Sequence, residues 1–199
     1  MNIDIKKLTP ELAEEYACFF DTTTHWGSAD TKCYCITWCN DDIYLNGGSH
    51  WFSSPEERRR NAIQRVRDGN IQGYLAYYDD KIVGWCNANT KADCKECVNY
   101  LRTDGGVPLE ECRTGEKVKF IFCFAIAPAV QRMGVATKLL DYICRDAAAD
   151  GYDYIEAYPN KIITEASRDY KGPLAMYEKC GFTVHAEKEG NVVVRKVLK

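Results

Sequence analysis

The chain has 199 residues, of which 46% are hydrophobic and 28% are charged, the composition of an ordinary globular protein. This length suits one sizeable core, so we expect a single domain over 1–199. The formal net charge of −3 argues against nucleic acid as the main partner. No apolar run approaches the roughly 20 residues that span a bilayer, and no signal-like apolar segment follows Met1. We therefore expect a cytoplasmic protein without a membrane partner.

The first half of the sequence predicts a strand, two helices and a β-hairpin. Isoleucines alternate with polar residues at the start, as in an edge strand. A Thr-Pro or Ser-Pro pair followed by acidic residues marks the beginning of each helix. An Asp-Asp pair separates two strand-like runs, as in a short hairpin. In chain order we expect a strand at 2–7, helices at 10–20 and 55–68, and strands at 73–78 and 81–89.

The second half begins with a polar insertion at about 91–117 and then alternates strands with helices. A fully apolar strand precedes an amphipathic helix, and a short helix leads into a terminal hairpin. We expect strands at 120–126 and 152–158, helices at 135–149 and 173–179, and a hairpin of 182–186 with 192–198. This order predicts an α/β fold with a central mixed β-sheet flanked by helices.

The segment 120–149 carries the clearest functional pattern. Its first seven residues are all apolar, which predicts a central strand buried on both faces, and Pro128 ends that strand. Apolar residues at helical spacing follow from Val135. A strand that turns directly into a helix start directs unpaired backbone N–H groups at one point, which favours phosphate binding. Gly134 allows a ligand to approach the main chain closely.

Two motifs in this part of the chain resemble those of the GNAT superfamily of acyl-CoA-dependent N-acyltransferases. Residues 131–136 match its Q/R-x-x-G-x-G/A loop, with Ala136 in place of the last glycine. Residues 173–182 resemble its A-x-x-Y-E-K-x-G-F segment. The resemblance implies a GNAT-like fold, acetyl-CoA as co-substrate and Tyr177 as the general acid that protonates the leaving thiolate. The segment 33–38 resembles the Cys-x-Cys aromatic loop of one uncharacterised branch of this superfamily.

The resemblance also implies which residues hold the coenzyme. The loop binds its pyrophosphate, and the main chain at the end of the apolar strand pairs with the pantetheine arm as an added strand would. The asparagine that many members carry before the tyrosine is missing here, so no coenzyme contact is assigned to 168–171. The implied cofactor-binding residues are Phe124, Ala125, Ile126, Gln131, Arg132, Met133, Gly134, Val135, Ala136 and Thr137.

The acceptor side is less well defined by the sequence. Glu156 is an acid in an otherwise apolar strand and the best single candidate for the general base; the alternative is a polar residue on a solvated strand face. Trp38 is a candidate substrate contact, whereas His25 and His50 fit ordinary loop residues as well. We expect a primary amine of a small molecule or peptide to attack the thioester directly. The alternative function is a non-catalytic acyl-CoA-binding sensor, and a homodimer is expected by resemblance alone.

Eleven cysteines are an unusually high number for this length. Two groups, 33/35/39 and 94/97/112, contain enough thiols for a zinc site. Against zinc, Cys-x-Cys is a poor chelate for a tetrahedral ion, and a second C-x-x-C is missing. We therefore expect free, reduced thiols and no bound metal.

Overall fold

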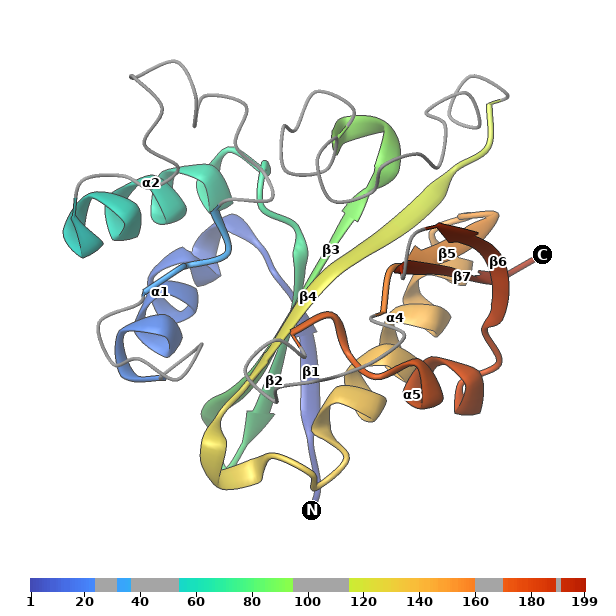
Figure 1. Ribbon diagram of the computed structural model, residues 1–199. Coiled ribbons are helices and arrows are strands. Elements are labelled where there is room, and N and C mark those ends of the chain that lie inside the picture. Colours follow the sequence, from blue (N-terminus) through green and yellow to red (C-terminus); the bar gives the residue numbers. More distant parts are fainter. Residues whose placement is uncertain (24–31, 37–53, 95–114, 160–169, 189–190) are drawn as a thin grey trace.

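The fold is known from a computed structural model, in which every β-strand belongs to one mixed sheet (Figure 1). The strand order among the described residues is β1-β2-β3-β4-β5-β7-β6. The strands are β1 (Asp4–Lys7), β2 (Gly73–Tyr78), β3 (Lys81–Thr90), β4 (Val118–Ile126), β5 (Tyr154–Ala157), β6 (Thr183–Lys188) and β7 (Asn191–Val197). The structure describes residues 1–23, 32–36, 54–94, 115–159, 170–188 and 191–199.

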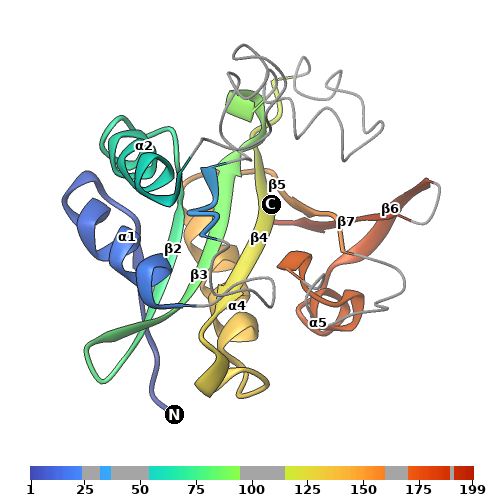
Figure 2. The same ribbon diagram turned by 60° about the vertical axis from the view of Figure 1, so that its left-hand side comes forward.

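The helices form a layer on each face of the sheet (Figures 1 and 2). On one face, α1 and α2 bury their apolar residues against β2 and β3. On the other, α4 and α5 pack over the middle and the β7 side. The bounds are α1 (Ala13–Thr22), α2 (Pro55–Arg67), α4 (Val135–Ala149) and α5 (Leu174–Lys179), with short 3₁₀ turns η1 (Pro10–Leu12), η4 (Lys91–Cys94) and η6 (Pro128–Val130). This arrangement confirms the expected mixed sheet flanked by helices.

Local sequence explains most of the element boundaries. The Ser54 side chain accepts a hydrogen bond from Glu57 N–H at 3.1 Å and so caps α2, as its Ser-Pro start predicted. Asp79 and Asp80 both adopt positive φ angles, 47° and 59°, as a tight two-residue hairpin turn requires. Thr9 differs from the expectation, because its side chain makes no capping bond and the first turn after it is 3₁₀. The α-helix therefore begins at Ala13, three residues after Pro10.

The sheet consists of two antiparallel parts joined at β4 and β5. Strands β1 to β4 pair antiparallel with one another, and so do β5, β7 and β6. The pair between β4 and β5 is parallel and covers four residue pairs, from Val118–Tyr154 to Ile121–Ala157. β5 is shorter than the predicted strand at 152–158, since it ends before Tyr158 and Pro159. Because this parallel pairing, the seam between the two parts, is short, the rest of β4 does not pair with β5.

Candidate functional site

The C-terminal half of β4 has an open edge. β5 stops opposite Ile121, so in the described part of the chain residues 123–126 pair with β3 alone. Figure 1 shows β4 running on past the end of β5 while the two parts of the sheet diverge. An unpaired strand edge presents N–H and C=O groups that can bind an extended ligand. The open edge contains Phe124, Ala125 and Ile126, the three strand residues predicted to meet the coenzyme.

A β-bulge lies at the point where this edge becomes free. Asn87 pairs with Cys123 and Ala88 pairs with Ile121, which leaves Phe122 as an extra residue in β4. Strand side chains normally alternate between faces, but Phe122 and Cys123 both lie on the face away from α4. Bulges bend strands and occur often beside active sites. Here the bulge separates the paired half of β4 from its open half.

The loop before α4 forms the second part of the site. Gly134 is the N-cap of α4 with φ +82°, and a Cβ there would meet no heavy atom within 4 Å. The first hydrogen bond of the helix runs from Lys138 N–H to the Gly134 carbonyl at 3.0 Å. The N–H groups of residues 135–137 therefore lack intrahelical acceptors, and the helix dipole adds positive potential at the same point. A helix start of this kind can bind an anion, and the pyrophosphate site expected here stays a prediction.

The side chains of the loop have different surroundings. Residues 131–134 are exposed, whereas the Val135 side chain is buried and anchors the helix start in the core. Ala136 and Thr137 are half-buried. The Gln131 side chain donates to the Ile126 carbonyl at 3.1 Å, which ties the loop to the end of β4. The loop residues can thus offer main-chain donors to a ligand while the helix start stays fixed.

Tyr177 lies beside the open edge of β4. Its ring is fully buried and packs edge-on against Phe182, with centroids 5.2 Å apart, and against Phe124 at 6.5 Å. The Tyr177 hydroxyl donates to the Lys171 carbonyl at 2.7 Å. At Gly172, with φ +80°, a Cβ would lie 2.8 Å from the end of the Met176 side chain and 3.4 Å from the rings of Phe124 and Tyr177. The fold thus brings Tyr177 to the predicted pantetheine strand through a closely packed turn.

Glu156 has surroundings that differ from both sequence-based interpretations. Its side chain is fully buried in β5, so it does not lie on a solvated strand face. Lys91 Nζ donates to Oε1 at 2.7 Å, and the Tyr158 hydroxyl donates to the same oxygen. Arg195 donates to Oε2 from Nε at 2.7 Å and from Nη2 at 2.6 Å. Both oxygens already accept from cations, so we propose a structural role for Glu156 in place of the expected general base.

Two buried asparagines on β3 were not singled out from the sequence. Asn87 is fully buried and Asn89 is 2% exposed, and the Asn89 amide donates to the Asn87 side chain. Asn89 also accepts from Gln72 N–H at 3.2 Å. Both asparagines follow Trp85 in an otherwise apolar strand, and this interruption of the apolar pattern was the available signal. They place polar groups beside the bulge, on the face covered by α1 and α2.

Several sequence-based hypotheses fall outside the described residues. They concern Trp38, His25 and His50 and the cysteines at 39, 97 and 112. Within the described ranges, no three His, Cys, Asp or Glu side chains come together as a metal site would require. No helix among the described residues is long and apolar enough to cross a membrane.

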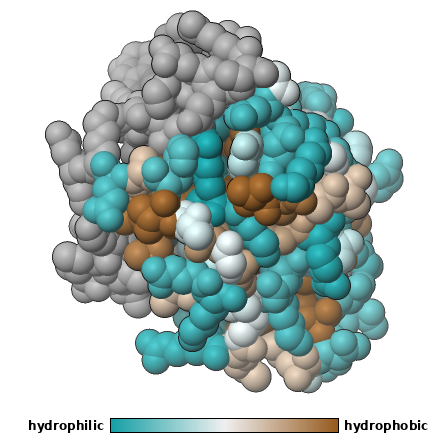
Figure 3. Space-filling model, turned by 90° about the vertical axis from the view of Figure 1, so that its right-hand side faces the viewer, coloured by the Kyte–Doolittle hydropathy of each residue, from teal (hydrophilic) through white to brown (hydrophobic). Residues whose placement is uncertain are grey.

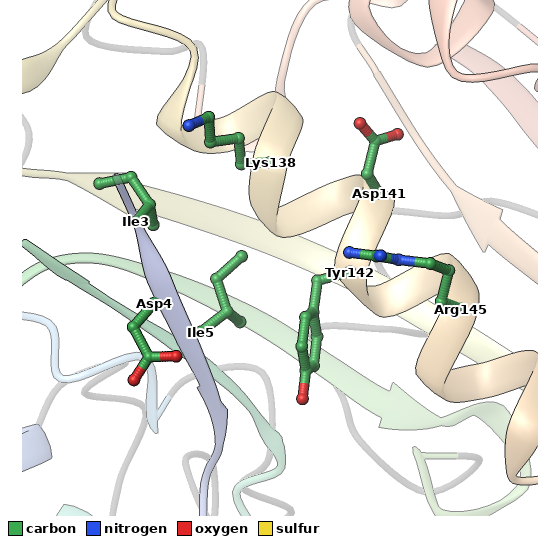
Figure 4. A pocket seen from close by; sticks show the side chains of 7 residues that line it. All are labelled: Ile3, Asp4, Ile5, Lys138, Asp141, Tyr142 and Arg145. Carbon is green, nitrogen blue, oxygen red and sulfur yellow. The ribbon is translucent and has the colours of Figure 1, made fainter. Parts of the chain in front are cut away.

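A separate cavity of about 250 Å³ lies between β1 and α4 (Figure 4). It contains none of the residues predicted for the site. Its lining side chains are Ile3, Asp4, Ile5, Lys138, Asp141, Tyr142 and Arg145.

On the β5–β7–β6 side, Figure 3 shows apolar areas separated by hydrophilic ones among the coloured residues. Val184 and Val197 of the terminal hairpin are 47% and 63% exposed. The expected homodimer remains a prediction.

Comparison with known proteins identifies the family. The model of the acetyltransferase (GNAT) family matches residues 33–182. The fold is similar to a mosquito arylalkylamine N-acetyltransferase like 5b (14% identity, 98% of this chain and 100% of that chain, TM-score 0.59). It is also similar to an acetyltransferase of the GNAT family from Streptococcus pneumoniae (15%, 100% of each chain, 0.54). A third similar structure is the PaiA N-acetyltransferase of Thermoplasma acidophilum in complex with coenzyme A (15%, 99% of each chain, 0.53).

No curated protein sequence matches the chain. The family model covers three quarters of the sequence, and it includes both motifs that carried the resemblance. The likeness to solved GNAT structures confirms the expected fold. The chain therefore belongs to the GNAT family of acetyltransferases.

Proposed function

We propose that this protein transfers an acetyl group from acetyl-CoA to a primary amine of a small molecule or peptide. The observation that carries this proposal is the open edge of β4 at residues 123–126, which leads directly to the uncapped start of α4. Coenzyme A combines an extended amide-containing arm with a pyrophosphate. An unpaired strand edge suits the arm, and a helix N-terminus suits the pyrophosphate.

The donor half of the site would be formed mainly by main-chain groups. The pantetheine amides would pair with the edge at Phe124, Ala125 and Ile126. The pyrophosphate would accept from the N–H groups around Gly134, whose position is open to a ligand. A related fold, the PaiA N-acetyltransferase of T. acidophilum, has been solved with coenzyme A. A backbone N–H of the open edge would also stabilise the oxyanion that forms when the amine attacks the thioester.

Tyr177 would supply the proton for the leaving thiolate. Phenols and alkyl thiolates have similar basicity, so proton transfer between them is close to balanced. The hydroxyl donates to the Lys171 carbonyl, and it would exchange this acceptor for the thiolate sulfur during the reaction. The ring packs against Phe124 and Phe182, which hold the hydroxyl near the open edge of β4.

The acceptor amine would bind on the α1 and α2 face of the sheet, beside the bulge. The buried amides of Asn87 and Asn89 supply polar groups there. Because Glu156 is already paired with cations, we propose that the amine loses its proton through water. A single domain over 1–199 and a cytoplasmic location complete the proposal.

The proposal is tested by acetyl-CoA turnover with a library of primary amines, with free coenzyme A and acetylated product both quantified by chromatography. The Tyr177→Phe variant should lower kcat by about 100-fold or more, since a positioned general acid contributes about 10²–10⁴. Coenzyme affinity should stay unchanged. Tyr74→Phe is the matched control, because it also removes a part-buried hydroxyl hydrogen bond, to Asp146 at 2.7 Å, away from the site.

The rival function, a non-catalytic acyl-CoA sensor, rests on one observation. The Tyr177 hydroxyl is buried and paired with a main-chain carbonyl, as in a purely structural tyrosine. Acetyl-CoA binding by the wild type without turnover of any amine would favour the sensor and contradict the proposed reaction. Equal kcat values for Tyr177→Phe and the wild type would contradict the acid role alone.

A further inference from the structure

Two cysteines far apart in the sequence meet on the face of the sheet that α1 and α2 cover. Cys35 belongs to the described segment 32–36, drawn in blue in Figure 2, and Cys123 lies at the β4 bulge. Their Sγ atoms are 2.6 Å apart. Both side chains are nearly fully buried, with 2% and 3% exposed. Since a disulfide bond is about 2.05 Å long, the two sulfurs need to approach by only about half an ångström.

The segment that carries Cys35 is held firmly in an unusual conformation. Tyr34 and Cys35 are consecutive residues with left-handed φ angles, 46° and 52°. The Tyr16 hydroxyl donates to the Tyr34 carbonyl at 2.5 Å, and the Tyr34 hydroxyl donates to Asp21 at 2.7 Å. Arg59 Nε donates to the same carboxylate at 2.9 Å. Such conformations persist where the surroundings over-determine them, and they are often functional. Here they fix the Cys35 sulfur against Cys123.

The two thiols differ in acidity. Burial alone would raise the pKa of Cys35, but hydrogen bonds from Cys123, Trp85 and Asn87 outweigh it and leave that pKa below its ordinary value. Burial, together with the neighbouring Cys35, raises the pKa of Cys123. Cys35 is thus the more acidic of the two thiols, and we take it as the attacking partner.

We propose that Cys35 and Cys123 form a peroxide-sensitive thiol pair, whose oxidation links the 32–36 segment to β4 by a disulfide bond. The Cys35 thiolate attacks one oxygen of hydrogen peroxide, which breaks the O–O bond, gives a sulfenic acid and releases hydroxide that is protonated to water. The Cys123 sulfur then attacks the sulfenic sulfur, and the S–O bond breaks. The hydroxyl leaves with the Cys123 proton as a second water. In total, two thiols are oxidised and one peroxide is reduced to two waters.

The change at Cys35 prepares Cys123 for the second step. Part of the rise in the Cys123 pKa comes from the hydrogen bond and the negative charge of Cys35. A sulfenic acid carries no such charge, so Cys123 loses its proton more readily once Cys35 is oxidised. Cys33 is a poorer attacker, because burial and the neighbouring Cys35 raise its pKa to about 12. Cys86 lies under the opposite face, where burial also raises its pKa.

The experiment treats the folded, reduced full chain with increasing hydrogen peroxide, blocks remaining thiols with an alkylating agent and maps peptides by mass spectrometry. We expect a link between the peptides of Cys35 and Cys123, with loss of two hydrogen atoms, before Cys86 or Cys144 reacts. Cys33→Ser should keep the link, and Cys35→Ser should abolish it. In Cys123→Ala, dimedone should capture a sulfenic acid on Cys35. The readout is covalent chemistry, so it does not depend on any acetyltransferase activity.

Three outcomes would overturn the proposal. The first is a Cys33–Cys35 link in place of the Cys35–Cys123 link in the wild type. The second is a link that persists in Cys35→Ser and so involves another thiol. The third is oxidation of Cys86 while Cys35 and Cys123 stay reduced. The wild type and Cys33→Ser both carry the intact pair, so the result does not rely on a variant that fails to fold. Circular dichroism shows whether Cys35→Ser and Cys123→Ala are folded.

Discussion

At Gly134 a side chain would strain the main chain without meeting any other part of the protein. The φ of +82° strains any other residue, but an added Cβ meets open space. Gly134→Glu should therefore abolish coenzyme A binding, because its carboxylate would face the pyrophosphate. Gly134→Ala is the matched control, with the same strain of about 1–2 kcal/mol and no charge. Calorimetric titration with coenzyme A measures both, and equal affinities for the two variants would refute the loop assignment.

Gly172 has a different requirement, since it combines a positive φ with close packing. Gly172→Ala places a Cβ 2.8 Å from the Met176 side chain and 3.4 Å from the Tyr177 ring. We expect a loss of about 2–4 kcal/mol of unfolding free energy, from strain and overpacking together. Gly151→Ala has a similar φ of +74° and no neighbour within 4 Å, so it should lose clearly less. Urea unfolding compares them; equal losses would show that packing at Gly172 is unimportant.

Single residues differed in how far the sequence could predict them. The glycine of the loop and Tyr177 belong to contiguous motifs, so the segment around each carries its own signal. The surroundings of Glu156 could not be predicted, because its partners Lys91 and Arg195 come from distant parts of the chain. No local pattern indicates such contacts. The Cys35–Cys123 contact was equally unpredictable, since 88 positions separate the two residues.

At the scale of elements, the Glu156 side chain joins three of them. Its carboxylate pairs with Lys91 of η4 and with Arg195 of β7, directly opposite on the neighbouring strand. Glu156→Gln leaves two buried cations without their anion, so we expect a loss of about 3–5 kcal/mol of unfolding free energy. Lowered kcat with unchanged stability in chemical denaturation would instead restore Glu156 as the base. Asp153→Asn is the control, because its carboxylate lies just before β5 and pairs with the exposed Lys199 at 2.7 Å.

An exposed ion pair links β1 to the end of α4. Lys7 Nζ lies 2.5 Å from Asp150 Oδ2 and 3.1 Å from Asp146 Oδ2. The hydrogen bond from Lys7 holds the pKa of Asp150 below its usual 3.8. A lowered carboxyl pKa stabilises the fold above the ordinary value, and this stabilisation disappears as the pH falls through the lowered value.

The expected contribution of this pair is about 0.5 kcal/mol, because both side chains are exposed and screened by solvent. Asp150→Asn should lower the unfolding free energy by this amount at about pH 6 and by less at about pH 3. Urea unfolding at both pH values measures the difference. A loss that is larger in acid would contradict the assigned direction of the pKa shift.

Elements were predicted more accurately than their pairing. Every described strand and α-helix lies within a few residues of its expected range, because apolar periodicity and Pro, Gly and Asp signals are local. The β4 bulge and the early end of β5 were not expected. Both depend on which strands lie next to each other, and this is decided by packing across the whole sheet. The open edge was therefore expected at Phe124–Ile126 only through the family resemblance.

At the scale of the molecule, the order of elements was sufficient to indicate a mixed sheet between helices. The family model and the similar structures confirm that fold. The proposed donor half of the site consists of contiguous segments, so its residues could be named from the sequence. The proposed acceptor half involves buried polar residues such as Asn87 and Asn89, which no contiguous motif indicated. The domain arrangement and the homodimer stay predictions.

The four-residue seam between β4 and β5 also has a mechanical consequence. The two antiparallel parts of the sheet are internally well paired, but strand pairing between them is limited to this short parallel ladder within the described residues. A ligand arm paired along residues 123–126 would lengthen the ladder without adding a residue to the protein. Because the unfolded chain lacks this edge, such a ligand would stabilise the folded state by mass action. The co-substrate would then act as a temporary strand that stiffens the sheet for as long as the acyl group remains to be transferred.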